Sequence, residues 1–428
     1  MVLGSEVEYG ISLMGAAADP VRLSEDVVAR VPGLGLGRLD RMLGNGARVY
    51  VDHAHPEYSG PECASATDVL RWELAGDELM RAAAERVSAS LGERVLLHRN
   101  NTDGKGRAYG YHENYLLGRE VPFERVVDQF TGHLVSRVVL SGAGRVGLGQ
   151  SGEQPGFQLS QRADFMEALV GIETTTRRPL VNTRDEPHAD PGRWRRLHVI
   201  TGDATLAHVA TVVRLGSAAL VLAAISANAC AVPRLVDPLA AIRAYSRDTS
   251  LTVAQPCTDG VARTALDLQR CYWDAAAPLV DMLPDGALVL RLWDEMLRDA
   301  VIDPVLLADR VDWAAKLKVL RGLMARHGWG WDSDQARAVD LQWHELDPDR
   351  GIGARLRAAG VLRELVGQTD MLKATVEPPS GTRASVRGGL LREHAGRVGR
   401  SDWGHVVVQT GDLPERIDLP DPFTGHPQ

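Results

Sequence analysis

"NGARVYVDHAHPEYSGPE", residues 45–62, alternates like a β-strand but carries acids and histidines where a buried strand would carry valines. On a strand, residues two apart share a face, so Arg48, Tyr50 and Asp52 point the same way. A polar row of this kind is poorly suited to a core. The stretch therefore predicts a sheet with one polar, open face.

The same alternation recurs elsewhere in the first half of the chain. Glu6 and Glu8 share a face in "GSEVEYGISL", and Arg196 shares one with His198 in "RWRRLHVI". The segment "YGYHENYLL" predicts a further row, which consists of Tyr109, Tyr111, Glu113 and Tyr115. If these strands are neighbours, the open face is lined with carboxylates, histidines, tyrosines and an arginine.

Carboxylates on adjacent strands repel one another unless something compensates them. The simplest compensation is a hard divalent cation, and magnesium prefers oxygen ligands and commonly bridges to phosphate. Glu6, Glu8 and Glu57 are therefore candidate magnesium ligands, and Arg196 is a candidate phosphate clamp.

Each segment taken alone has a plainer interpretation. A Glu-x-Glu pair on an edge strand is usually a solvated face, and His53 and His55 suit turn and capping positions. The segment "NNTDGKG" fits an ordinary hairpin loop and lacks the GxxxxGK[ST] spacing of a P-loop. The occurrence of four such segments in one half of the chain favours a shared site.

Composition limits the class of protein. The 428-residue chain is 44% apolar and 24% charged, as in a globular protein, and its net charge of −8 argues against general nucleic-acid binding. Its four cysteines include no CxxC pair, which argues against a disulfide framework or a zinc site. The start of the chain has no signal-peptide pattern, and the apolar stretch 215–232 predicts a buried core helix rather than a membrane span. We therefore expect a cytoplasmic protein with no membrane or nucleic-acid partner.

The order of the elements predicts the fold class. Strands and turns alternate over the first two hundred residues, with one long helix over 66–92 and Thr67 as its N-cap. Helices dominate 204–365, and a Pro- and Gly-rich stretch follows. This pattern predicts an α+β fold: an open, mostly antiparallel sheet packed on helices over 1–365, and a small C-terminal domain with a disordered tail over 366–428.

At full length the motifs resemble a known family. The residues that carry the resemblance are "GSEVEYGIS", "NGARVYVDHAHPEYSGPE", "NNTDGKGRAYGYHENYL", "RPLVNTRDEPHAD" with "RRLHVITGDATLA", "AVDLQWHELDPDRG" and "EPPSGTRASVRG". They are similar to the depupylase/deamidase of the protein modifier Pup. That enzyme and its sister, the Pup ligase, form a branch of the glutamine synthetase-like carboxylate–amine ligases.

The resemblance implies an open sheet cradle that holds ATP (or ADP plus phosphate) and Mg²⁺. It also implies a groove for Pup, which is acidic and largely disordered, and activity on pupylated proteins by a monomer. The implied reaction is hydrolysis at the side-chain carbonyl of the C-terminal residue of Pup. This reaction deamidates glutamine to glutamate or cuts the isopeptide bond to a substrate lysine.

The resemblance also implies roles for individual residues. Asp52 matches the essential aspartate, which attacks the carbonyl or activates a water for that attack. The implied binding residues are Glu6, Glu8, Glu57 and His198 for the metal, and Asn101, Thr102 and Arg196 for the nucleotide. Net hydrolysis of an amide needs no phosphoryl energy, so the nucleotide and metal would be electrostatic and structural parts of the site.

Two features bear on the choice between hydrolase and ligase. Ligases usually have D-V-G-S-H-P-E-Y, whereas "DHAHPEY" places only His53 and Ala54 between the aspartate and the next histidine, which is the depupylase spacing. The segment before the aspartate is short, as in the ligase, and is expected to form a brief helix over 22–31, with Ser24 as N-cap, and no lid. A Pup ligase-type carboxylate–amine ligase and a non-catalytic Pup-binding paralogue are the alternatives.

Overall fold

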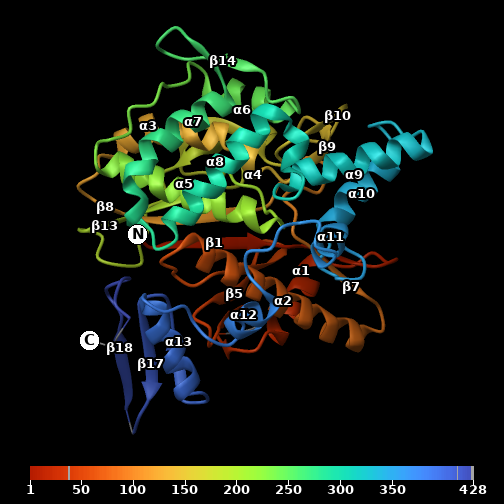
Figure 1. Ribbon diagram of the computed structural model, residues 1–428. Coiled ribbons are helices and arrows are strands. Elements are labelled where there is room, and N and C mark those ends of the chain that lie inside the picture. The colour runs from red at the N-terminus through yellow and green to blue at the C-terminus, as the bar shows by residue number, and fades with distance from the viewer. Residues whose placement is uncertain (37–38, 412, 426–428) are drawn as a thin grey trace.

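The computed structural model describes residues 1–36, 39–411 and 413–425. It has the α+β architecture that the sequence predicts, with an open antiparallel sheet packed on helices (Figure 1). The helices between residues 208 and 343 lie above strand β1 in this view, and helices α2 and α12 lie below it. The C-terminal residues form a small unit at the lower left.

Within the described residues, seven strands form the main sheet in the order β13-β8-β1-β6-β5-β4-β3, and every neighbouring pair is antiparallel. These strands are β1 (Leu3–Glu8), β3 (Leu34–Gly35), β4 (Asp40–Met42), β5 (Arg48–Asp52), β6 (His55–Ser59), β8 (Tyr111–Gly118) and β13 (Trp194–Val199). The register sets Glu8 and Tyr50 on either side of Glu57, and sets Glu6 beside His112. Acids from separate parts of the chain therefore meet on one face.

The two faces of the sheet differ in character. Val7, Tyr111 and Tyr115 are fully buried and pack in the cores beneath the sheet. His112 and Asn114 alternate with these tyrosines and contact Glu6 on the opposite, polar face. The predicted polar row of Tyr111, Glu113 and Tyr115 was therefore wrong in its direction, because the apolar bodies of the tyrosines turn that row toward the helices.

Helices cover the apolar face, and the last of those in the described residues packs instead on the C-terminal strands. They are α1 (Pro20–Arg30), α2 (Ala66–Leu91), α3 (Phe123–Ser136), α4 (Val138–Ser141), α5 (His208–Ser226), α6 (Pro238–Arg247), α7 (Ala265–Ala276), α8 (Gly286–Ile302), α9 (Asp312–His327), α10 (Asp334–Trp343), α11 (Ile352–Ala358), α12 (Gln368–Ala374) and α13 (Arg383–Glu393). The helix capped by Asp19 begins earlier than predicted, and Ser24 instead donates a hydrogen bond to the carbonyl of Ala54. The N-cap of α2 is Ser65 rather than Thr67, because the Ser65 hydroxyl accepts the backbone N–H of Asp68.

Helix α5 is the apolar stretch that the sequence predicts to be a core helix. It is long and apolar enough to cross a membrane, but 94% of its most apolar window is buried inside the protein. It packs against α2, α3, α7 and α8. The prediction of a core helix is confirmed.

The remaining strands form small sheets at the periphery. They are β2 (Gly10–Leu13) with β7 (Val95–His98), β9 (Arg145–Leu148) with β10 (Gln154–Gln158), β11 (Met166–Gly171) with β12 (Arg178–Asn182), β14 (Ala254–Pro256) with β15 (Ala262–Thr264), and β16 (Val398–Ser401) with β17 (His405–Gln409) and β18 (Pro414–Asp418). Only β11 and β12 among these pairs are parallel.

The C-terminal unit consists of α13 and β16–β18 around a separate hydrophobic cluster, which includes Val386 and Val406 and also Met42 of β4. Helix α12 instead belongs to the larger body, since Ala374 is part of the main core. The predicted boundary after residue 365 therefore lies before a helix of the larger body. The predicted disordered tail is ordered through residue 425, where Phe423 contacts Trp194, and residues 426–428 lie outside the described part.

Candidate functional site

A cleft of about 490 Å³ opens over the polar face of the sheet. Strands β1, β5, β6 and β8 supply its acidic floor, and the loop over 106–110 supplies one wall. Residues 174–176, Arg178 and two further arginines, Arg162 and Arg184, complete the lining, and Arg162 and Arg178 donate to carbonyls of this loop. The cleft thus combines an acidic floor with basic walls.

The first acidic group lies on the floor and consists of Glu8, Asp52 and Glu57. Each offers a carboxylate oxygen, and these oxygens lie within 4.8 Å of one another. The Tyr50 hydroxyl donates to Glu57 at 2.8 Å. Burial, together with the nearby charges of Glu8 and Glu6, raises the pKa of Glu57 well above its ordinary value. A bound cation would remove this repulsion, and three oxygen ligands suit magnesium.

The second group lies beside the first and consists of Glu6, His112 and His198, again with ligand atoms within 4.8 Å. Burial opposes ionisation of Glu6, but the hydrogen bond with His112 (3.1 Å) and the charges of His198, His112 and Arg196 together outweigh it, so the pKa of Glu6 lies below its ordinary value. Burial lowers the pKa of His198, which keeps its ring neutral. Its Nδ1 contacts Asn114 at 2.9 Å, while its buried Nε2 has no hydrogen-bond partner among the described residues. A neutral, buried, unpartnered imidazole nitrogen is what a metal ligand requires.

The two groups approach each other through Gly110. A Cβ atom at this position would lie 2.2 Å from Oε1 of Glu8 and 2.5 Å from Nε2 of His112. Any side chain here would push the carboxylate and the imidazole apart. The chain therefore needs glycine at residue 110 for the close approach of the two groups.

The wall carries arginines that have no carboxylate partner in the cleft. Arg162 is 1% exposed and donates to the carbonyls of Ile200 and Tyr109. Burial and the neighbouring Arg178 lower the pKa of Arg162 to about 10. Arg178 likewise donates only to carbonyl oxygens, those of Thr174 and Ala108. Guanidinium groups held by neutral acceptors over an acidic floor suit a polyphosphate bridged by cations.

The predicted nucleotide-binding residues lie elsewhere than in the cleft lining. Asn101 accepts the backbone N–H of Ala204 and donates to the carbonyl of Tyr109. The hydroxyl of Thr102 donates to the carbonyl of Arg107 and accepts the N–H of Gly104. Both side chains thus stabilise the loop that follows them without lining the cleft themselves. Residues 106–110 of this loop line the cleft.

Arg196, the predicted phosphate clamp, is bound on the floor beside the second group. It donates to Asn114 at 2.9 Å, contacts Glu6 at 3.7 Å and pairs with Glu186 at 3.2 Å. These contacts hold the Arg196 guanidinium beside Glu6.

The structure brings together Glu6, Glu8, Asp52, Glu57 and His198, which the sequence also marked. Sequence reasoning did not assign three further residues to the cleft: His112, and Arg162 and Arg178, whose segments "RADF" and "TTTRRP" were expected to supply a basic strip for Pup. His112 lies in the other row of β8, together with Asn114. The sequence predicts that the row of tyrosines lies on the polar face and therefore does not indicate His112. No sequence spacing connects Arg162 and Arg178 to the acids, because only the fold of the wall brings them there.

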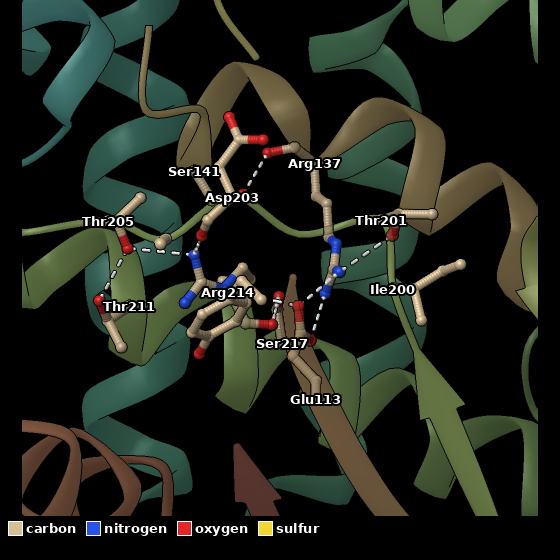
Figure 2. Close-up of polar contacts among 12 residues, drawn as sticks. Glu113, Arg137, Ser141, Ile200, Thr201, Asp203, Thr205, Thr211, Arg214 and Ser217 are labelled. Carbon is tan, nitrogen blue, oxygen red and sulfur yellow. Dashed lines mark hydrogen bonds and ion pairs between the residues drawn. The ribbon is translucent and has the colours of Figure 1, made fainter. Parts of the chain in front are cut away.

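A second ionic cluster lies behind the floor, on the helix side of β8 (Figure 2). Glu113 accepts two hydrogen bonds from Arg137, at 2.7 and 2.8 Å, and Arg214 lies 3.6 Å away. Arg214 also donates to the Thr205 hydroxyl at 3.0 Å and stacks on Tyr111. This cluster joins α3 and α5 to the underside of the strand that carries His112.

Comparison with known proteins agrees with this arrangement. A family model described as Pup-ligase protein matches residues 1–407. The Pup deamidase/depupylase of Mycobacterium tuberculosis (strain ATCC 25618 / H37Rv) is 43% identical over 426 residues, which cover 97% of this chain and 83% of the relative.

Two solved structures match over most of the chain. The complex between Pup and its ligase PafA has a TM-score of 0.89 at 31% identity and covers 99% of this chain and 89% of that one. The Pup ligase PafA in complex with ADP has a TM-score of 0.82 at 33% identity and covers 90% of this chain and 87% of that one. The sheet packed on helices is therefore the glutamine synthetase-like fold of this enzyme group, and the chain belongs to the Pup-ligase protein family.

Proposed function

We propose that the chain is a depupylase-type hydrolase. Its reaction would cleave the isopeptide bond between the C-terminal glutamate of Pup and a substrate lysine, and would deamidate a C-terminal glutamine. The observation that carries the proposal is the cleft itself: Asp52, with its side chain 40% exposed, stands at the edge of a carboxylate floor that faces an arginine wall. The strong match to a relative named Pup deamidase/depupylase supports the hydrolytic direction.

In this proposal, the residues of the cleft have separate roles in the reaction. Asp52 either attacks the side-chain carbonyl carbon, so that the C–N bond breaks, the amine leaves with a proton and water then hydrolyses the anhydride formed with Asp52, or it takes a proton from the water that attacks, and the amine leaves with a proton. Bound Mg²⁺ would supply positive charge, and the nucleotide that holds it would supply a template for the substrate carbonyl. Glu8 and Glu57 would hold one cation and the second group another. Arg162 and Arg178 would face the phosphates, as the match to an ADP complex of a relative supports.

The turn after Asp52 supports hydrolysis over ligation. Only His53 and Ala54 join β5 to β6, the short spacing typical of depupylases. The segment between β2 and β5 contributes no described residue to the cleft lining, because α1 packs on α2 and the short strands pair beside β5. The cleft is therefore open on this side, which favours access by folded, tagged proteins and loose retention of nucleotide.

One experiment tests the proposal. Purified protein is incubated with a Pup-conjugated protein and with Pup that ends in glutamine, with and without Mg²⁺ and ATP or ADP. We expect release of Pup and deamidation only when nucleotide and Mg²⁺ are added. Conjugation of Pup to a lysine of an untagged protein, with consumption of ATP, would instead identify a ligase. Pup binding without either reaction would identify a non-catalytic paralogue.

A further inference from the structure

We propose that His53 is a positioning residue that holds the Asp52 carboxylate in its reactive orientation, an inference that rests on the proposed hydrolysis. Nδ1 of His53 lies 2.9 Å from Oδ1 of Asp52. In the described part of the chain, this ion-pair contact is the one that Asp52 makes with a basic side chain. The contact draws one oxygen of Asp52 toward the ring and leaves the other for the substrate.

The backbone of His53 is the second observation. This residue lies in the two-residue turn between β5 and β6 and has a φ of 53°. The left-handed region disfavours any residue with a Cβ atom, so glycine, asparagine or aspartate usually occupies such a position. The His53 side chain is 68% exposed, so packing does not explain its presence. A strained residue beside a reactive group indicates a role for its side chain.

Asp52 needs such a partner because of its surroundings. It is the last residue of β5, its side chain is partly solvated, and its carboxylate lies within 4.8 Å of those of Glu8 and Glu57. Repulsion from these two acids pushes the free side chain toward solvent. His53 lines the cleft beside Asp52, and its contact with Oδ1 holds the carboxylate at the cleft against this repulsion. Attack on a carbonyl requires this orientation to be held closely.

His55, the other histidine of the hairpin, has a different role. Its Nδ1 contacts the carbonyl of Tyr9 at 3.0 Å, and its ring stacks on Tyr109 with 4.3 Å between centroids. His55 therefore supports the wall of the cleft, and His53 alone of the two serves Asp52.

Two substitutions separate positioning from structure. In His53→Gly the turn keeps a residue suited to positive φ, so the melting temperature should not fall. The kcat for release of Pup should fall by between about tenfold and a hundredfold, because Asp52 loses its orientation. KM should stay within about twofold, since substrate contacts are unchanged. His53→Asn tolerates positive φ and retains a short N–H donor, so it should recover much of the lost kcat.

The outcomes are distinct. A Gly variant with wild-type kcat would overturn the positioning role, as would a parallel fall of kcat and melting temperature, or a stable Asn variant no better than Gly. A wild-type protein that releases no Pup would overturn the hydrolase proposal and this inference together. Wild-type release with an unaffected Gly variant would overturn this inference alone.

Discussion

Glu57 and Glu113 are both buried in the main sheet, on opposite faces, and their partners differ. Glu113 is 0% exposed and is paired with the guanidinium of Arg137, with Arg214 close by (Figure 2). Glu57 is 1% exposed, yet its nearest charged groups are other carboxylates, and its pKa is raised. Glu113 thus has its counter-charges within the protein, whereas Glu57 lies against further carboxylates.

The difference separates structural from functional carboxylates. A buried acid with two arginines is complete within the protein, whereas a group of acids without a cation costs free energy until a ligand supplies one. The polar face is therefore expected to respond to ligands, and the helix face to changes in folding. Substitutions on each face test this division.

The largest effect is expected on the polar face, from Asp52→Asn. The substitution is nearly isosteric and removes the charge that attacks or accepts a proton, so the rate of Pup release should fall by up to about 10⁴-fold. Because the carboxylate is exposed and has no buried partner, the melting temperature should stay unchanged. Single-turnover release of Pup from a conjugate measures the rate. If the variant retains more than a tenth of the wild-type activity, a residue other than Asp52 carries out the chemistry.

The helix face should show the opposite behaviour, in Glu113→Ala. Removal of this carboxylate leaves Arg137 and Arg214 buried without their counter-charge, which should lower the free energy of unfolding by about 3–5 kcal/mol. Urea denaturation measures the loss. An Arg137→Met/Glu113→Met double variant is the control, because it leaves one buried arginine rather than two without a counter-charge and should cost less than the single change. A single variant as stable as wild type would show that this pair does not hold the sheet to the helices.

More of the fold than of the site could be predicted from the sequence. Strands in the first half, helices in the second and an apolar α5 all follow from periodicity and apolar content, which are local properties of the sequence. The boundary of the C-terminal unit could not be placed this way, since α12 joins the main core through contacts such as that of Ala374, far from it in sequence. The helix starts at Asp19 and Ser65 were missed because several residues near each start can cap.

For the site, the sequence marked the floor and missed the wall. The acids of β1, β5 and β6 stand out because charged residues interrupt strand patterns. His112 was assigned to the hidden face, because a row of tyrosines and one of polar residues both fit a strand. Asn101 is conspicuous in the sequence, yet it stabilises the loop from behind. Arg162 reaches the cleft only through tertiary packing.

A third carboxylate, Glu62, is expected to make the free energy of unfolding depend on pH. Burial raises its pKa, but Arg387 and Arg383 of the C-terminal unit outweigh burial and lower the pKa from 4.5 to about 2. An acid with a depressed folded-state pKa stabilises the protein above its unfolded pKa, and this stabilisation disappears as the pH falls from about 5 to 2. The difference corresponds to about 3 kcal/mol. Denaturation of wild type and Glu62→Gln at pH 6 and pH 3 should show a gap that narrows on acidification; a constant gap would contradict the prediction.

On the polar face, Glu8→Gln should remove a cation ligand and relieve repulsion at the same time. In wild type, Mg²⁺ at a hundred times its dissociation constant should add about 2.7 kcal/mol of stability. The variant should lose most of this gain, while its metal-free stability should rise by up to about 1 kcal/mol. Glu113→Gln is the matched control on the other face and should lose stability with no change in the Mg²⁺ response. Equal behaviour of the two glutamine variants would remove the distinction between the faces.

The smallest effect is expected at the rim of the cleft, where an acidic modifier would approach a protein of net charge −8. Arg177 is exposed between the lining residues Thr176 and Arg178, so its charge can attract Pup without being desolvated. Arg177→Glu should weaken Pup binding by about two- to fivefold at low salt, mostly through slower association. The difference should shrink in 0.15 M salt, where the Debye length is about 8 Å. Arg22→Glu on α1 makes the same charge change outside the cleft and should have little effect. If the two variants bind Pup equally well at every salt concentration, the modifier does not pass this rim.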